Sequence, residues 1–168
     1  YLIYAGRISK QKGVEELIIS FLKSKTPNLK LKIVGDGPEL NSLKDKYKNP
    51  RIDFLGPKDN SEVIELIKHS KAVVSATKLY EGQPTLLCEA SLLGIPSIFP
   101  DFGGMPEFFK NDYPFKFEQY NYQELTKKIN DIHSSEDLKE IGKENKNYIL
   151  SVTDRKKLLE KFHHIVYA

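Results

Sequence analysis

The strongest constraint on the fold is a regular alternation of short apolar runs with segments whose apolar residues recur at helical spacing. The predicted strands cover residues 1–5, 29–34, 52–55, 71–76 and 95–99, and a sixth, edge strand is predicted around Phe115. Between the first two runs, one helix face is formed by Val14, Leu17, Ile18, Phe21 and Leu22. Strands that alternate with helices build βαβ units, so the pattern predicts a parallel sheet.

After about Asn121 the pattern is helical only, and we therefore predict a doubly wound α/β domain with a helical C-terminal tail. A length of 168 residues suits one domain, or one half of a two-domain enzyme. In such sheets, ligands bind beyond the carboxyl ends of the strands. The loop residues Gly6-Arg7, Gly35-Asp36, Gly56-Pro57 and Tyr80-Glu81 are all predicted to lie there. This common location predicts a single site.

The stretch from Tyr80 to Gly94 is predicted to form the centre of the functional site. Pro84 suits a first helical position, and Gly94 ends that helix. Glu81 and Glu89 flank the helix N-terminus with seven residues between them. Such a terminus attracts a phosphate, while carboxylates accept hydrogen bonds from sugar hydroxyls, so the pattern fits a nucleotide diphosphate sugar. The simpler alternative is a turn glutamate followed by a second glutamate that complements the helix dipole.

The loop between the first strand and its helix adds positive charge to this edge. Gly6 permits close approach of the backbone to a ligand, and Arg7 and Lys12 are two cations suited to a diphosphate. Two other turns are weaker signals. Residues 35–38 are also explained by a tight turn into a helix, whereas the backbone of residues 55–58 could pair with a base edge.

Composition and charge restrict the ligand and the compartment. A net charge of +3, from 26 basic and 23 acidic residues, does not predict nucleic-acid binding. No segment is long and apolar enough to span a membrane. The single cysteine, Cys88, excludes an internal disulfide and suits a reducing compartment such as the cytoplasm. The histidines and acidic residues show no metal-ligand spacing, so we expect neither a metal nor another cofactor.

The ordered motifs GRISKQKG, IVGDGPE, RIDFLG, EGQPTLLCEASLLGIPSI and GGMPE resemble the C-terminal half of GT-B glycosyltransferases, specifically the retaining enzymes of family 4 (GT4). The resemblance covers roughly residues 1–110, and Glu81 and Glu89 fit the family's E-x7-E motif. It implies that residues 1–168 are a donor-binding domain, and that the N-terminal, acceptor-binding domain is not present in this chain.

The resemblance also implies roles for individual residues. Arg7 and Lys12 would neutralise the donor diphosphate, and Glu81 would face the donor sugar; these three are the predicted catalytic residues. Glu89 would accept hydrogen bonds from the ribose. The predicted substrate-binding residues are Gly6, Leu55, Gly56, Pro57, Lys58, Gly82, Gln83, Pro84, Thr85, Leu86 and Glu89. Gln83-Pro84 stands where the family commonly has Phe-Gly, so one backbone donor is missing and the donor sugar is not specified.

The implied activity is metal-independent, retaining transfer of a sugar from a nucleotide diphosphate sugar to a glycan or lipid-linked acceptor. Such a reaction belongs to surface polysaccharide or glycoconjugate synthesis, and it is compatible with peripheral membrane association of the full-length protein. The 168-residue chain alone is expected to be inactive. Two alternatives remain: a GT-B sugar-nucleotide epimerase, and a non-catalytic nucleotide-sugar binding module.

Overall fold

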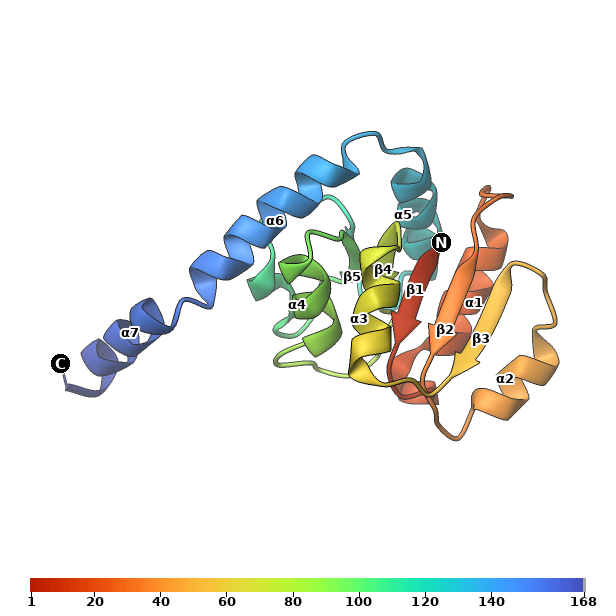
Figure 1. Ribbon diagram of the computed structural model, residues 1–168, viewed down its shortest axis with the longest axis horizontal. Coiled ribbons are helices and arrows are strands. Elements are labelled where there is room, and N and C mark those ends of the chain that lie inside the picture. Colours follow the sequence, from red (N-terminus) through yellow and green to blue (C-terminus); the bar gives the residue numbers. More distant parts are fainter. Residues whose placement is uncertain (168) are drawn as a thin grey trace.

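A six-stranded parallel sheet in the order β3-β2-β1-β4-β5-β6 forms the centre of the molecule (Figure 1). The computed structural model describes residues 1–167. The strands are β1 (Leu2–Ala5), β2 (Leu31–Val34), β3 (Ile52–Gly56), β4 (Ala72–Val74), β5 (Ser97–Pro100) and β6 (Lys116–Phe117). The parallel sheet predicted from the alternating pattern is confirmed, including the edge strand near Phe115.

Helices cover both faces of the sheet, as the doubly wound prediction requires. They are α1 (Val14–Lys23), α2 (Leu40–Lys46), α3 (Asn60–Lys68), α4 (Thr85–Leu92), α5 (Tyr122–Ser134), α6 (Leu138–Val152) and α7 (Arg155–Tyr167), with short 3-10 turns η1 (Lys10–Lys12) and η2 (Met105–Phe108). Figure 1 shows α3 and α4 on one face, and α1 packs with α5 on the other. The predicted α1 face is confirmed, because Val14, Leu17, Ile18 and Phe21 are fully buried.

The core lies between these layers and continues to the β6 edge as an aromatic cluster. Phe99 and Phe109 have ring centroids 4.2 Å apart, and Tyr113 lies against both rings. The Tyr113 hydroxyl accepts from Ser97 N at 2.7 Å and donates to Ser97 O at 3.0 Å. This ring therefore ties the segment before β6 to the start of β5.

Three helix boundaries differ from the sequence prediction. Pro84 is predicted to be the first helical residue, but it is the N-cap of α4 and has an extended backbone. Its carbonyl accepts from Cys88 N at 3.0 Å. The sequence predicts a cap for the next helix at Asn60 or Ser61, two residues that favour helix N-termini. The cap of α3 is instead Asp59, because the Glu62 side chain accepts from Asp59 N at 3.2 Å. The sequence also predicts a short helical turn over residues 107–110. In the structure this turn is η2, which starts two residues earlier, since Pro106 suits its first turn.

The predicted helical tail is confirmed, and its middle part packs against α4. A Cβ on Gly142 would lie 1.9 Å from the carbonyl oxygen of Gly94, so α6 crosses the end of α4 at backbone contact. Nearby, Asn145 Nδ2 donates to Ser91 Oγ at 2.7 Å. Beyond this contact, α7 extends away from the sheet (Figure 1). None of the helices in residues 1–167 is long and apolar enough to cross a membrane.

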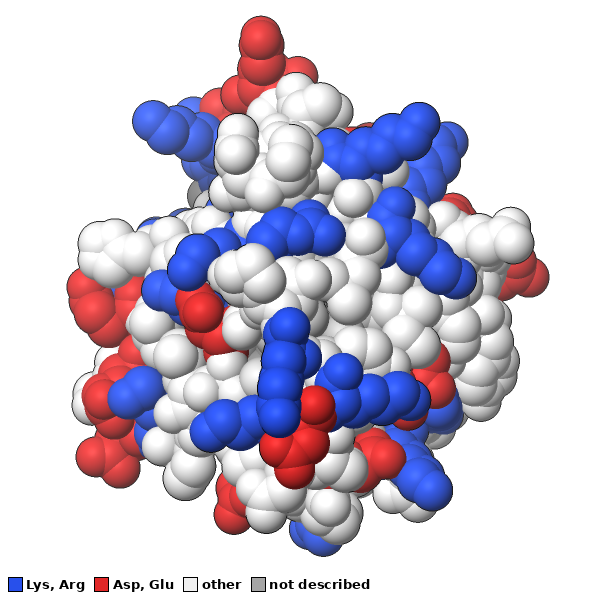
Figure 2. All heavy atoms as spheres, turned by 90° about the vertical axis from the view of Figure 1, so that its right-hand side faces the viewer, with Lys and Arg blue, Asp and Glu red and all other residues white. Residues whose placement is uncertain are grey.

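The surface at the β3 end of the sheet carries charges of both signs. Figure 2 shows acidic side chains among the basic ones on this face. Lys46 Nζ lies 2.6 Å from Glu15 Oε1, and Lys30 Nζ lies 3.4 Å from Asp53 Oδ2. The lysines here are therefore partly neutralised by neighbouring carboxylates.

Candidate functional site

The loops that follow β1, β2 and β3 are joined by backbone hydrogen bonds at the carboxyl edge of the sheet. Gly35 N donates to Gly56 O at 2.9 Å, and Ile8 N donates to Asp36 O at 2.8 Å. A Cβ on Gly35 would lie 1.9 Å from Gly6 O, so only glycine allows the loops after β1 and β2 to pack this closely. The turn at 35–38 thus leads into α2 and also supports the loop that carries Arg7.

A cavity of about 150 Å³ lies between this loop and the first turn of α4. Its described lining comprises Tyr4, Ala5, Gly6, Arg7, Lys12, Ser75, Glu81, Gln83, Pro84, Thr85, Leu86, Leu87 and Met105. All three predicted catalytic residues are therefore brought together here. Lys12 Nζ lies 2.5 Å from Glu81 Oε1, and Thr77 Oγ1 donates to the same oxygen at 3.1 Å.

The Lys12–Glu81 pair is partly shielded from solvent, since the two side chains are 28% and 23% exposed. Partial burial strengthens the attraction relative to a fully exposed pair. Arg7 is different: its side chain is exposed, and no carboxylate in residues 1–167 forms an ion pair with it. Tyr4 supports the loop from below, because its hydroxyl donates to Arg7 O at 2.7 Å, and burial raises the pKa of Tyr4.

The first turn of α4 separates this cavity from a second one of about 460 Å³. Its described lining comprises Ala5, Gly6, Val34, Gly35, Pro57, Lys58, Asn60, Val63, Thr85, Leu86 and Glu89. Thr85 and Leu86 line both cavities, and N–H groups in a first helical turn have no carbonyl one turn earlier to bond. Glu89 is half-buried in the second cavity, and burial raises its pKa.

The predicted glutamates thus lie on opposite sides of a helix N-terminus, one in each cavity. Lys58 also lies at the second cavity, where its ammonium is 2.8 Å from Glu62 Oε1. Leu55, Gly56 and Gly82 are not among the described residues that line either cavity. Gly56 contributes indirectly, through the hydrogen bond that its carbonyl accepts from Gly35.

Sequence reasoning missed the contribution of the loop after β5. Gly104 N donates to Glu81 O at 2.8 Å, and a Cβ on Gly104 would lie 2.5 Å from Gly82 O. Met105, fully buried, lines the first cavity. The motif GGMPE was the available signal, but nothing in the sequence indicates that it packs under Glu81.

Comparison with known proteins identifies relatives of this fold and sequence. The family model described as glycosyl transferases group 1 matches residues 1–148. N-acetyl-alpha-D-glucosaminyl L-malate synthase of Bacillus anthracis is 34% identical over 115 residues, which is 66% of this chain and 29% of the relative. The capsular polysaccharide biosynthesis glycosyltransferase CapM of Staphylococcus aureus is 30% identical over 145 residues, 82% of this chain and 37% of the relative. The chain thus spans less than half the length of these relatives.

Solved structures share the fold at low sequence identity. The catalytic domain of cholesterol-alpha-glucosyltransferase from Helicobacter pylori superposes with a TM-score of 0.81 at 22% identity, over 90% of this chain and 98% of that one. Anabaena HepE in complex with UDP gives a TM-score of 0.81 at 21% identity, over 97% of this chain and 48% of that one.

Proposed function

This chain belongs to the glycosyl transferases group 1 family (GT4), and from that membership we propose that it is the donor-binding domain of a retaining, nucleotide-sugar-dependent glycosyltransferase. The proposed reaction moves a sugar from a nucleotide diphosphate sugar to a glycan or lipid-linked acceptor. Relatives that act in capsular polysaccharide and amylovoran biosynthesis support a role in polysaccharide or glycoconjugate synthesis.

The observation that carries the proposal is the arrangement of two carboxylates around one helix N-terminus. The diphosphate would lie at the first turn of α4, where the N–H groups of Thr85 and Leu86 can bind its oxygens. The donor sugar would then reach Glu81 in the first cavity, and the ribose would reach Glu89 in the second. Pro57 and Lys58 would lie near the base.

The cations near α4 would favour bond cleavage in the donor. Breaking the sugar–phosphate bond places negative charge on the diphosphate, and fixed positive groups there stabilise the transition state more than the substrate. Lys12 is held by Glu81 at the first cavity, and Arg7 has an exposed guanidinium at the same cavity. The proposal therefore assigns charge neutralisation to Arg7, Lys12 and backbone N–H groups, without a metal.

The acceptor would be held by a second, N-terminal domain of the full-length protein. A cleft between two domains would exclude water and hold the acceptor nucleophile near the sugar carbon, which one domain alone cannot do. We place the enzyme in the cytoplasm, because Cys88 is the single cysteine among the 168 residues and is a free thiol, which suits a reducing compartment.

The test is a transfer assay with a panel of nucleotide sugars, on the 168-residue chain beside the full-length protein, together with calorimetry of UDP binding. We expect both proteins to bind nucleotide and only the full-length protein to transfer sugar. Robust acceptor-dependent transfer by the chain alone would refute the two-domain site. An epimerised sugar formed without acceptor would favour the epimerase alternative, and nucleotide binding without any product from the full-length protein would favour the binding module.

A further inference from the structure

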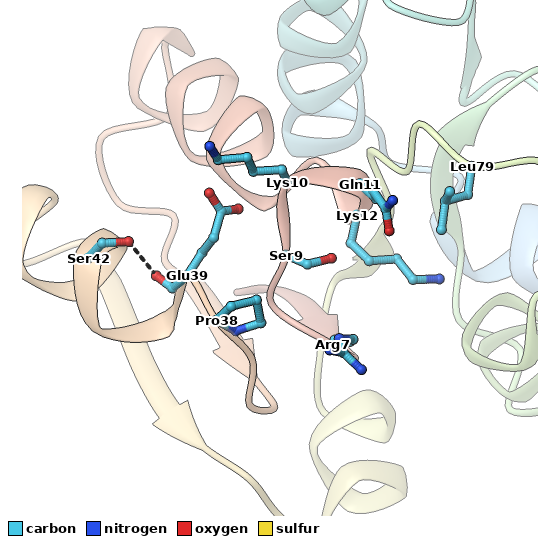
Figure 3. Close-up of a pocket in the computed structure, with 9 residues that line it drawn as sticks. All are labelled: Arg7, Ser9, Lys10, Gln11, Lys12, Pro38, Glu39, Ser42 and Leu79. Atoms are coloured by element: carbon cyan, nitrogen blue, oxygen red, sulfur yellow. Dashed lines mark hydrogen bonds between the residues drawn. The ribbon is translucent and has the colours of Figure 1, made fainter.

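A third hollow, of about 670 Å³, lies on the far side of the 7–12 loop from α4 (Figure 3). Its described lining comprises Arg7, Ser9, Lys10, Gln11, Lys12, Pro38, Glu39, Ser42 and Leu79. Arg7 and Lys12 line this hollow and the first cavity alike, so the two spaces share one wall. A molecule in the hollow would therefore lie beside the place assigned to the donor diphosphate and sugar.

The hollow offers both a cation and a carboxylate that are not already paired. Lys10 is exposed and has no ion-pair partner within residues 1–167. Glu39 contributes a carboxylate whose Oε2 is buried and has no hydrogen-bond partner in the same part of the chain. Figure 3 shows the Glu39 side chain extending from the start of α2 toward the segment that carries Lys10.

These groups complement a sugar ring that bears an anionic substituent. Glu39 lines the hollow and can accept hydrogen bonds from ring hydroxyls through its carboxylate. Lys10 can donate charge-assisted hydrogen bonds to a carboxylate or a phosphate. Leu79 supplies an apolar surface for the face of the ring. A neutral sugar would use only part of this set, whereas an acidic one would use both charges.

We infer that this hollow is an acceptor subsite for an acidic sugar unit, either a hexuronate or a sugar phosphate. The inference rests on the proposed transferase function. It adds one subsite on this domain to the acceptor contacts that we assign to the N-terminal domain. Glu39 binds hydroxyls of the acidic unit and Lys10 binds its anionic group. The shared wall of Arg7 and Lys12 keeps this unit next to the donor sugar.

The test measures binding of three probes to the full-length protein by ligand-observed NMR, at saturating UDP so that the donor site is filled. The probes are glucuronate, glucose 6-phosphate and glucose, and the first two distinguish a carboxylate from a phosphate. We expect an acidic probe to bind more tightly than glucose, and Lys10→Gln to weaken that probe about fivefold, as for one partly exposed charge-assisted hydrogen bond. UDP affinity should not change in Lys10→Gln.

The matched control is Lys44→Gln, which removes an exposed lysine from α2 that is outside the described lining of the hollow. It should leave all three affinities unchanged. Glu39→Gln should weaken the binding of glucose as well as that of the acidic probes, because it alters the group that accepts hydrogen bonds from the hydroxyls. Equal binding of all probes, or equal losses in the two lysine variants, would overturn the subsite. Failure of UDP, GDP and ADP alike to bind the unmodified protein would instead refute the proposed function.

Discussion

Replacing Glu89 by alanine should weaken nucleotide binding through the ribose alone. The half-buried carboxylate lines the second cavity, where it would accept hydrogen bonds from two hydroxyls. Losing a charged acceptor of this kind should cost about 1.5–3 kcal/mol, or roughly ten- to over a hundredfold in affinity. Calorimetry with UDP measures the loss, and Glu140→Ala, at an exposed position on α6, is the control.

A UDP analogue that lacks both ribose hydroxyls separates a direct contact from a general disturbance of the cavity. The analogue should bind the unmodified protein about as weakly as UDP binds Glu89→Ala, and the substitution should weaken the analogue little further. An equal loss for UDP and for the analogue, in a variant that is still folded, would refute the ribose assignment.

The same carboxylate predicts a stability difference with a defined sign. Burial raises the pKa of Glu89 above its ordinary value of 4.5, so the folded state binds its proton more tightly than the unfolded state. Its contribution to stability is therefore fully present below pH 4.5 and is lost as pH rises through the folded-state pKa. Glu89→Gln should consequently be more stable than the unmodified protein at pH about 7, and this advantage should vanish below pH 4.5 in urea titrations.

Two further predictions concern the phosphate contacts and the packing of α6. Arg7→Ala and Lys12→Ala should each lower the affinity for UDP more than the affinity for uridine, and this difference should shrink at high salt. Equal losses of affinity for both ligands would indicate damage to the fold instead. Gly142→Ala should destabilise the protein by about 1–3 kcal/mol in urea titrations, because the new Cβ would clash with Gly94 O at 1.9 Å. The cost of this clash should exceed the gain in helix propensity from glycine to alanine. Gly82→Ala, whose Cβ meets nothing within 4 Å, should stay within about 0.5 kcal/mol of the unmodified protein, and similar losses in both variants would contradict the packing argument.

The sheet could be predicted because each strand is a local apolar run between turn residues, and parallel strands are buried on both faces. Helix starts were harder to place, since several residues compete to cap them. At α3, Asp59, Asn60 and Ser61 can all cap a helix. Asp59 becomes the cap because its backbone N–H donates to the Glu62 side chain. At α4, Pro84 fits a first helical position as well as a cap, and its extended backbone shows that it is the cap.

The site was predictable as a set of strand-end loops but not in its internal contacts. The pairing of Lys12 with Glu81 joins residues on different loops, and no local pattern encodes it. The same holds for Gly104, which binds the backbone of Glu81 from the loop after β5. The roles assigned to Arg7, Lys12, Glu81 and Glu89 stay predictions, to be tested by the binding experiments above.

The strand order has a consequence for the time course of synthesis on the ribosome. Leu2 of β1 pairs with Ala72 of β4, so the central pair joins segments 70 residues apart. At about 5–20 residues per second, β4 follows β1 by about 4–14 s. During this interval β1 can pair with β2, while its other edge stays open to any strand that reaches it. Val73 and its neighbours therefore cover the open edge of β1 late, and slower translation through residues 35–70 would prolong the period in which nascent chains can associate through that edge.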